Sequence, residues 1–232
     1  MRILFKTNYK QDLNLAKHGG HRFWYGLLIL VLFTVPLIFD GYYIGEATRI
    51  LIYAMAGLGL MVLTGFTGQV SLGHAAFLAI GAYTNAWFLA QGFSSFVALP
   101  MAALLSMIGG LLVAIPAARM SGIYLAIATL AFAIIVEDVA GHLSSITGGN
   151  RGMMVDVPIL FGYQIWESWE LYLFVLSILV AATLAVLNIL RSPLGRAMIA
   201  VRESEVSSQA LGVNPMKIKV FAFTVSLSLI HI

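Results

Sequence analysis

The stretch that begins Arg191-Ser192-Pro193-Leu194-Gly195-Arg196 and runs through Leu211-Gly212-Val213-Asn214-Pro215 to Lys219 separates two long apolar runs. It carries five Lys or Arg residues against two glutamates, whereas the flanking runs 171–190 and 220–232 carry no charge. A basic segment between apolar runs is typical of a loop at the cytoplasmic surface of a membrane protein, where Lys and Arg accumulate. The sequence therefore predicts a helical membrane fold with one polar element that a soluble partner can bind.

The composition indicates the same class of protein. Of the 232 residues, 60% are hydrophobic and only 10% are charged, against about 25% charged in soluble domains, and the mean hydropathy is +0.94. The net charge of +3 is too small for a basic coat that binds nucleic acid. The sequence contains no cysteine, which excludes disulfides and thiolate metal sites. We expect an integral membrane protein that contacts the lipid bilayer and no nucleic acid.

Apolar runs long enough to cross a bilayer, about 20 residues each, recur along the chain. The last run, 220–232, is too short to cross a hydrocarbon core of roughly 30 Å at about 1.5 Å per residue, and indicates a truncated seventh span. The expected fold class is all-α, a polytopic transmembrane helical bundle with about six complete spans plus a truncated seventh. The complete spans are expected at residues 24–39, 50–66, 70–90, 96–118, 122–140 and 171–190.

Positive charge sets the expected orientation. The basic arm 1–23 precedes the first span, which we interpret as a retained anchor because it has no small-residue cleavage site. With this arm in the cytoplasm, six spans return the chain to the cytoplasm at the basic loop 191–219, and the acidic loop 141–170 falls outside. Residues 24–232 are expected to form one transmembrane domain, incomplete at its C-terminus.

A polar segment with three glycines, 65–77, lies at the junction of the second and third expected spans. Its backbone is expected to be non-helical in part, and must then be buried in protein or line a cavity, because peptide groups exposed to lipid cost several kcal/mol each. Ser71 suits the N-cap of the following helix, whose N-terminus would favour an anionic group such as a substrate carboxylate. The alternative is a tight cytoplasmic turn in which His74 is a hydrogen-bonded packing residue.

Other features of the sequence narrow the function. Glu137 and Asp138 fall near the outer end of the fifth span, where a helix-end role or snorkelling is favoured over ion transport. The sequence has no phosphate-binding loop, no paired-histidine metal motif and no nucleophile turn. We expect this chain not to be an enzyme, not to hydrolyse ATP itself, and to need no catalytic residues, metal or cofactor.

Three blocks of the sequence resemble one family. Gly68-Gln69-Val70-Ser71-Leu72-Gly73-His74-Ala75-Ala76-Phe77 is similar to the signature of membrane permeases of branched-chain amino-acid ABC importers, the LivH and LivM group. The second block is Gly122-Ile123-Tyr124-Leu125-Ala126 leading to Thr147-Gly148-Gly149-Asn150-Arg151-Gly152, and the third is Gly195-Arg196-Ala197 with Arg202-Glu203-Ser204-Glu205 through Leu211-Gly212-Val213-Asn214. The last two blocks favour the LivM branch, and the resemblance covers roughly residues 50–225.

The resemblance implies a permease subunit of an ATP-driven importer for branched-chain amino acids in the bacterial plasma (inner) membrane. Its implied partners are a second, LivH-like permease, two cytoplasmic ABC ATPase subunits and an extracytoplasmic solute-binding protein. Related permeases serve urea and short-chain amides, so these stay open as substrates. The residues by themselves also leave open an ion-coupled secondary carrier in which Glu137, Asp138 or His74 binds the ion. The substrate-pathway candidates are Gln69, Ser71, Gly73, His74, Thr147, Gly148 and Gly149.

The resemblance also implies a role for the basic loop, as a coupling helix that lies along the membrane face and docks into a groove of the ATPase. Ser192 and Pro193 suit the N-cap and first position of such a helix, and Gly212 and Pro215 suit its end. The ATPase-coupling candidates are Gly195, Arg196, Arg202, Glu203, Glu205 and Gly212.

Two details of this loop bear on how it would dock. Leu194, Met198 and Val201 are spaced to form one apolar stripe along a helix. The sequence has Val206-Ser207-Ser208 where the coupling motif of ABC importers usually begins with Glu-Ala-Ala. This difference leaves open which residue anchors the ATPase.

Overall fold

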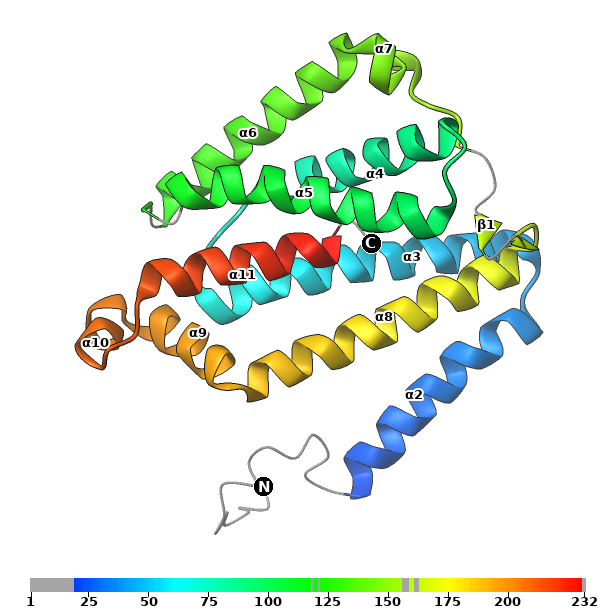
Figure 1. Ribbon diagram of the computed structural model, residues 1–232. Helices are drawn as coiled ribbons and strands as arrows, with labels where there is room; N and C mark the ends of the chain where they lie inside the picture. The colour runs from blue at the N-terminus through cyan, green and yellow to red at the C-terminus, as the bar shows by residue number, and fades with distance from the viewer. Residues whose placement is uncertain (1–18, 118, 121, 156–158, 161–162, 231–232) are drawn as a thin grey trace.

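The computed structural model describes residues 19–117, 119–120, 122–155, 159–160 and 163–230, and within these ranges the chain is a bundle of helices (Figure 1). The first half contains α2 Gly19–Ile38, α3 Gly41–Leu60, the π-helix η1 Met61–Phe66, α4 His74–Ala90, α5 Ser95–Ala117 and α6 Ile123–His142. The second half contains α7 Ser144–Thr147, the 3-10 turn η2 Gly149–Arg151, α8 Ser168–Arg191, α9 Pro193–Glu203, α10 Glu205–Ala210 and α11 Pro215–Ile230.

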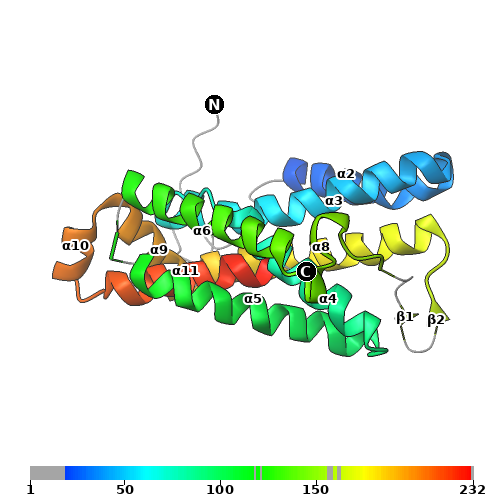
Figure 2. The same cartoon turned by 90° about the horizontal axis from the view of Figure 1, so that it is seen from above.

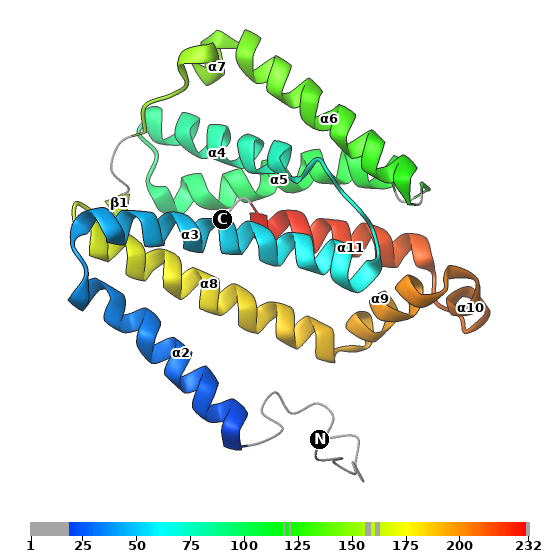
Figure 3. The ribbon, with the colours of Figure 1, turned by 180° about the vertical axis from the view of Figure 1, so that it is seen from behind.

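The long helices α3, α4, α5, α8 and α11 run side by side, with α6 at one edge of the bundle and α2 at the other (Figures 1 and 3). The short helices α9 and α10 lie at one end, and α7 lies at the opposite end with a small hairpin, β1 Ile159–Leu160 and β2 Tyr163–Gln164 (Figure 2). The first residues of α2 lie toward the α9–α10 end (Figures 1 and 3). The start of α2 therefore lies nearer than its end to the 191–219 loop. The orientation of the chain in the membrane stays a prediction.

The main core surrounds α11, which packs against α3, α5, η1 and α9. Ala222, Phe223 and Leu227 of this helix are at most 1% exposed and pack with Leu63 of η1 and Met198 of α9. From residue 218 to 230 the side chains of α11 are buried or half-buried and none is exposed, as expected for a helix in the interior of a bundle. The last apolar run of the sequence is thus a central packing element.

Four helical stretches in the described part of the chain are long and apolar enough to cross a membrane, namely Gly41–Phe66, Ser95–Pro116, Ile123–His142 and Ser168–Arg191. The apolar part of α2, Arg22–Ile38, is shorter, and α4 and α11 contain 17 and 16 residues, below the usual span of about 20. An all-α membrane bundle is therefore observed, apart from the two-residue strands of the hairpin. The number of spans stays a prediction.

The second and third expected spans have different bounds in the structure. The second is longer, because α3 begins at Gly41 and continues without a break into η1. The third is shorter, because α4 begins at His74 and residues 68–73 are not helical. Ser71 was expected as the N-cap of this helix, but the N-cap is Gly73, so no side chain caps the helix. Ser71 uses its hydroxyl on His74 instead.

The basic loop also differs from the single helix that the sequence predicts. Ser192 caps α9 and Pro193 begins it, as expected, but Ser204 adopts extended backbone and separates α9 from α10. Ser204 then caps α10 by accepting from the Ser207 N–H at 3.2 Å. Pro215 does not stop a helix but starts α11, so residues 215–219 of the expected loop belong to that helix.

Candidate functional site

Thr67, which ends the helical stretch, and the non-helical segment 68–73 are held by backbone bonds to η1 and by side-chain hydrogen bonds to neighbouring elements. Thr67 Oγ1 donates to the Leu63 carbonyl of η1 at 2.5 Å, and Gln69 Nε2 donates to Thr67 Oγ1 at 3.1 Å and to the Lys219 carbonyl of α11 at 3.3 Å. Thr67 and Gln69 are both 3% exposed. The segment is therefore covered by protein on one side, which meets part of the requirement for non-helical backbone near a membrane. Gly68, Val70 and Leu72 on its other side are exposed.

A chain of hydrogen bonds joins this segment to α11 and α3 through His74. His74 Nδ1 lies 2.9 Å from Ser71 Oγ, and His74 Nε2 lies 2.9 Å from Ser226 Oγ. Because the Ser226 hydroxyl donates to the Gly59 carbonyl at 2.6 Å, it accepts from Nε2–H, so the geometry fits the neutral Nε2–H tautomer with Nδ1 accepting from Ser71. The hydroxyls of Ser71 and Ser226 and both ring nitrogens of His74 therefore each have a hydrogen-bond partner.

The close approach of α4 to α6 depends on Gly73. A Cβ at Gly73 would lie 2.2 Å from the Thr129 backbone oxygen of α6, a distance that no side chain can accommodate. The neighbouring Leu72 N–H donates to Thr129 Oγ1 at 3.0 Å, and that hydroxyl donates to the Ala126 carbonyl. The start of α4 is therefore fixed against the middle of α6 by one steric and one polar contact.

The outer turn of the second sequence block is held by its threonine and glycines. Thr147 Oγ1 donates to the Ala140 and Leu143 carbonyls at 2.6 and 2.8 Å and accepts from the Gly149 N–H at 3.1 Å. Gly148 has φ of +74° and its Cβ position lies 2.2 Å from the Gly152 oxygen. These residues shape the turn that places Gly149 and the following Arg151 beside α6.

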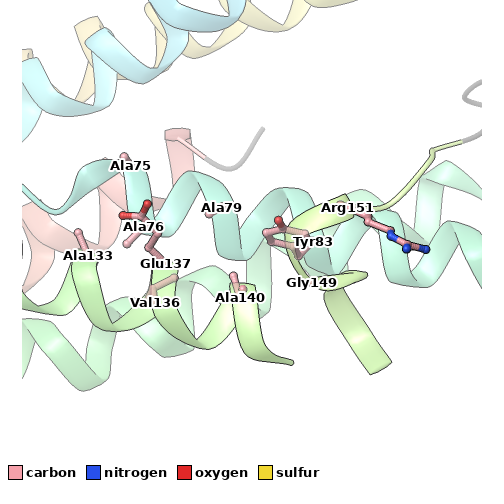
Figure 4. Close-up of a pocket in the computed structure, with 12 residues that line it drawn as sticks. Ala75, Ala76, Ala79, Tyr83, Ala133, Val136, Glu137, Ala140, Gly149 and Arg151 are labelled. Carbon is pink, nitrogen blue, oxygen red and sulfur yellow. The ribbon is translucent and has the colours of Figure 1, made fainter. Parts of the chain in front are cut away.

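A cleft of about 500 Å³ separates α4 from α6 (Figure 4). Its α4 side is lined by small residues and Tyr83, its α6 side includes Glu137, and the outer turn contributes Gly149 and Arg151. Glu137 lies near Ala76, whereas Arg151 lies beyond Tyr83 and its guanidinium is directed away from Glu137 (Figure 4). The small residues on both walls are Ala75, Ala76, Ala79, Ala133, Ala140, Gly141 and Gly152.

The α9–α10 arm is attached to the 65–74 region by two polar contacts. Arg202 Nη1 of α9 donates to the Gly65 carbonyl of η1 at 2.6 Å, a favourable place for a cation because helix C-terminal carbonyls carry partial negative charge. Lys219 of α11, whose side chain is 7% exposed, pairs with Glu205 of α10. Gln69 donates to the Lys219 carbonyl. Both contacts therefore lead to the 65–74 region.

The other coupling candidates have different surroundings. Gly195 is buried, and a Cβ there would lie 2.4 Å from the Leu190 oxygen, so it permits the sharp corner between α8 and α9. Glu203 pairs with its neighbour Arg202, Arg196 Nη1 donates to the Arg191 carbonyl at 3.2 Å, and Gly212 has φ of +83° in the turn before α11. Gly195 and Gly212 thus determine the path of the arm, while Arg196 and Glu203 are exposed.

The predicted apolar stripe of α9 is only partly buried. Met198 and Val201 are 0% and 2% exposed and belong to the main core, while Leu194 is 42% exposed. The largest apolar exposure on the arm is instead at Val206 and Leu211, which are 78% and 82% exposed. The arm therefore binds the bundle with one face and presents apolar side chains on another.

The structure brings together Gln69, Ser71 and His74 with α11, and places Gly149 at the cleft, but it does not bring these two groups into one site. Sequence reasoning did not identify Thr129, Ser226 or Lys219 as partners of residues 67–74, because each is distant from them in sequence. Thr129 and Ser226 also lie within apolar runs, whereas Lys219 was assigned to the basic loop. It also did not predict that Glu137 and Arg151 line the same cleft, although a glutamate inside an apolar span is by itself a sign of a functional site.

The fold and the buried polar segment define an α-helical protein embedded in a membrane. The chain belongs to the family of branched-chain amino acid transport system permease components, whose sequence model matches residues 42–229. This family comprises transport permease components rather than enzymes.

Two curated relatives show the extent of the similarity. The high-affinity branched-chain amino acid transport system permease protein LivM of Salmonella typhimurium strain LT2 is 37% identical over 205 residues, covering 78% of this chain and 48% of the relative. LivM of Escherichia coli strain K12 gives the same identity and coverage. The chain thus spans about half the length of these relatives. No solved structure matches the chain.

Proposed function

We propose that this chain is a LivM-like permease subunit of an ATP-driven ABC importer for branched-chain amino acids. It works with a second, LivH-like permease, two cytoplasmic ABC ATPase subunits and an extracytoplasmic solute-binding protein. It lies in the bacterial inner membrane with its N-terminal arm in the cytoplasm, and crosses the bilayer with six spans and α11 as a seventh. The similarity to the two LivM proteins supports the substrate class over urea or short-chain amides.

The observation that carries the proposal is the exposed apolar surface of the α9–α10 arm. Val206 of α10 and the following Leu211 are exposed. Because α10 lies at one end of the bundle (Figure 1), lipid tails do not reach them if the basic loop lies at the membrane surface. Burying one such side chain contributes about 1.5–3 kcal/mol. These two residues are the proposed anchors for an ATPase groove, in place of the Glu-Ala-Ala sequence of other importers.

The attachments of the arm provide a route from the ATPase to the spans. Movement of α9 acts on the Gly65 carbonyl through Arg202, and movement of α10 acts on Lys219 through Glu205. Both contacts end at the 65–74 region, which includes the π-helical turn η1, a conformation frequent at functional sites. Gln69, Ser71, Gly73 and His74 are proposed to shape the substrate pathway by positioning α4, and Thr147, Gly148 and Gly149 by positioning its outer turn.

The test is Val206→Asp in the assembled transporter, with Val155→Asp as the matched control, because Val155 is also an exposed valine (54%) but lies in the loop after η2. We expect Val206→Asp to reduce co-purification of the ATPase subunits and ATP-dependent leucine uptake into vesicles at least tenfold. Val155→Asp should leave both near the wild-type value.

Three results would contradict the proposal. Wild-type uptake that follows an imposed proton or sodium gradient without ATP would identify an ion-coupled carrier instead. Retention of the ATPase subunits by Val206→Asp would remove the arm from the ATPase interface. Competition of leucine uptake by urea or acetamide, rather than by valine and isoleucine, would assign the amide branch of the family.

A further inference from the structure

We infer that the α4–α6 cleft is a binding site for the amino-acid substrate, in which Glu137 receives the α-ammonium group. This inference rests on the proposed function, because it assigns part of the transport pathway to residues that the similarity does not single out. The site takes a small zwitterion with a primary ammonium group and an apolar side chain.

The size and lining of the cleft fit such a ligand. Its volume of about 500 Å³ is within the range of small-molecule sites, roughly 300–1,000 Å³. The walls carry methyl groups from alanines on both helices, so a branched aliphatic side chain finds apolar surface without a large side chain blocking it. The helices α4 and α6 approach each other at Gly73 and Thr129. The small residues that line the cleft leave the space between the two helices open.

The charge of Glu137 is the second observation. Glu137 lies five residues before the end of α6 at His142, about 7.5 Å along the helix axis. Its side chain is exposed, and Asp138 is the other carboxylate of the helix. Its neighbour Asp138 pairs with His142 at 3.4 Å, but within the described residues Glu137 has no hydrogen-bond or ion-pair partner. A carboxylate inside a span is expensive unless a polar partner or water reaches it.

A primary ammonium is the ligand group that would pair with this carboxylate, because a charge-assisted hydrogen bond is about twice as strong as a neutral one. Arg151 is exposed beside the outer end of the cleft, beyond Tyr83 (Figure 4). Its cation favours approach of the substrate carboxylate at the mouth while the ammonium group enters toward Glu137. The two charges thus orient a zwitterion that carries no net charge.

The first experiment compares Glu137→Gln with Asp138→Asn, which removes the same charge from the adjacent residue, also exposed but not part of the cleft lining. In the assembled transporter, Glu137→Gln is expected to lower ATP-dependent leucine uptake at least tenfold, with Asp138→Asn within twofold of wild type. Uptake by Glu137→Gln within twofold of wild type would overturn the inference while leaving the proposed function intact. Loss of the partner permease from purified Glu137→Gln would also overturn it, since the carboxylate would then be an interface residue.

A binding measurement that needs no transport keeps the two proposals separable. Thermal stabilisation of the purified wild-type protein by leucine, but not by 4-methyl-2-oxopentanoate, which lacks the ammonium group, is expected, and Glu137→Gln should remove the difference. Equal stabilisation by both compounds would overturn the inference whatever drives transport.

Substitution by leucine of two alanines of α6, one inside the cleft and one outside it, tests whether the cleft binds the substrate. Ala133 lines the cleft, whereas Ala131 is exposed and does not line it. Ala133→Leu fills the cleft and should abolish the leucine-dependent stabilisation, and Ala131→Leu should leave it unchanged. Stabilisation that survives Ala133→Leu would place the substrate elsewhere.

Discussion

Replacement of Gly73 by alanine tests the packing on which the 65–74 region depends. The added Cβ would lie 2.2 Å from the Thr129 backbone oxygen, whereas ordinary contacts begin at 3.4 Å, so the shortfall is 3.4 − 2.2, or about 1.2 Å. The obstructing atom belongs to the backbone of α6 and cannot rotate away, so α4 and α6 must move apart. Gly73 has φ of −98°, which alanine adopts freely, so any loss of stability comes from the clash and not from backbone strain.

The magnitude follows from two contributions. Overpacking of a tight contact costs about 1–3 kcal/mol, and separation of the helices also lengthens the Leu72–Thr129 hydrogen bond, a further loss of about 0.5–1.5 kcal/mol. The expected decrease in the free energy of unfolding is therefore about 1.5–4.5 kcal/mol. At about 2–4 °C per kcal/mol for a chain of this length, a loss of about 3 kcal/mol lowers Tm by about 6–12 °C.

The assay is thermal unfolding of the purified protein in detergent, followed by intrinsic tryptophan fluorescence. Gly57→Ala is the matched control, because no atom lies within 4 Å of its Cβ position on α3, and it should be neutral or slightly stabilising. Thr129→Val removes the hydroxyl and its bonds to the Leu72 N–H and the Ala126 carbonyl while keeping the side-chain volume, and should cost about 0.5–1.5 kcal/mol. A Gly73→Ala protein with the Tm of Gly57→Ala would refute the assignment of this glycine to helix packing.

The remaining predictions concern buried polar contacts and one turn. His74→Ala and Ser226→Ala, made singly and together, should show a coupling energy of about 1 kcal/mol in a double-mutant cycle of unfolding; additive losses would mean that the two side chains do not bond. Glu205→Gln should destabilise the protein more than Lys219→Met, because it leaves the ammonium of a side chain that is 7% exposed without its partner; the reverse order in denaturation would contradict a buried lysine. Gly148→Ala should lower Tm and also weaken leucine-dependent stabilisation, because a Cβ 2.2 Å from the Gly152 oxygen displaces the outer turn; an unchanged melting curve would exclude that contact.

The class of the fold could be predicted because it depends on properties that each segment carries by itself. An apolar run of about 20 residues is helical wherever lipid surrounds it, since only a helix satisfies its own peptide groups. The cap at Ser192, the start of α9 at Pro193 and the interruption of helix before His74 were likewise readable from local chemistry. Family membership followed from short ordered motifs, which the match over residues 42–229 confirms.

The sequence by itself therefore determined that this is a helical membrane protein of a known permease family, with a basic arm at one end, because hydropathy, charge and motif are local properties. Only the tertiary structure decided which residues meet: Gln69 with Lys219, His74 with Ser226, and Arg202 with Gly65. It also decided that Glu137 faces a cleft while Asp138 does not. Such pairings are set by how close the helices approach one another, and small residues spread over several spans fix that distance without leaving a pattern in any one of them.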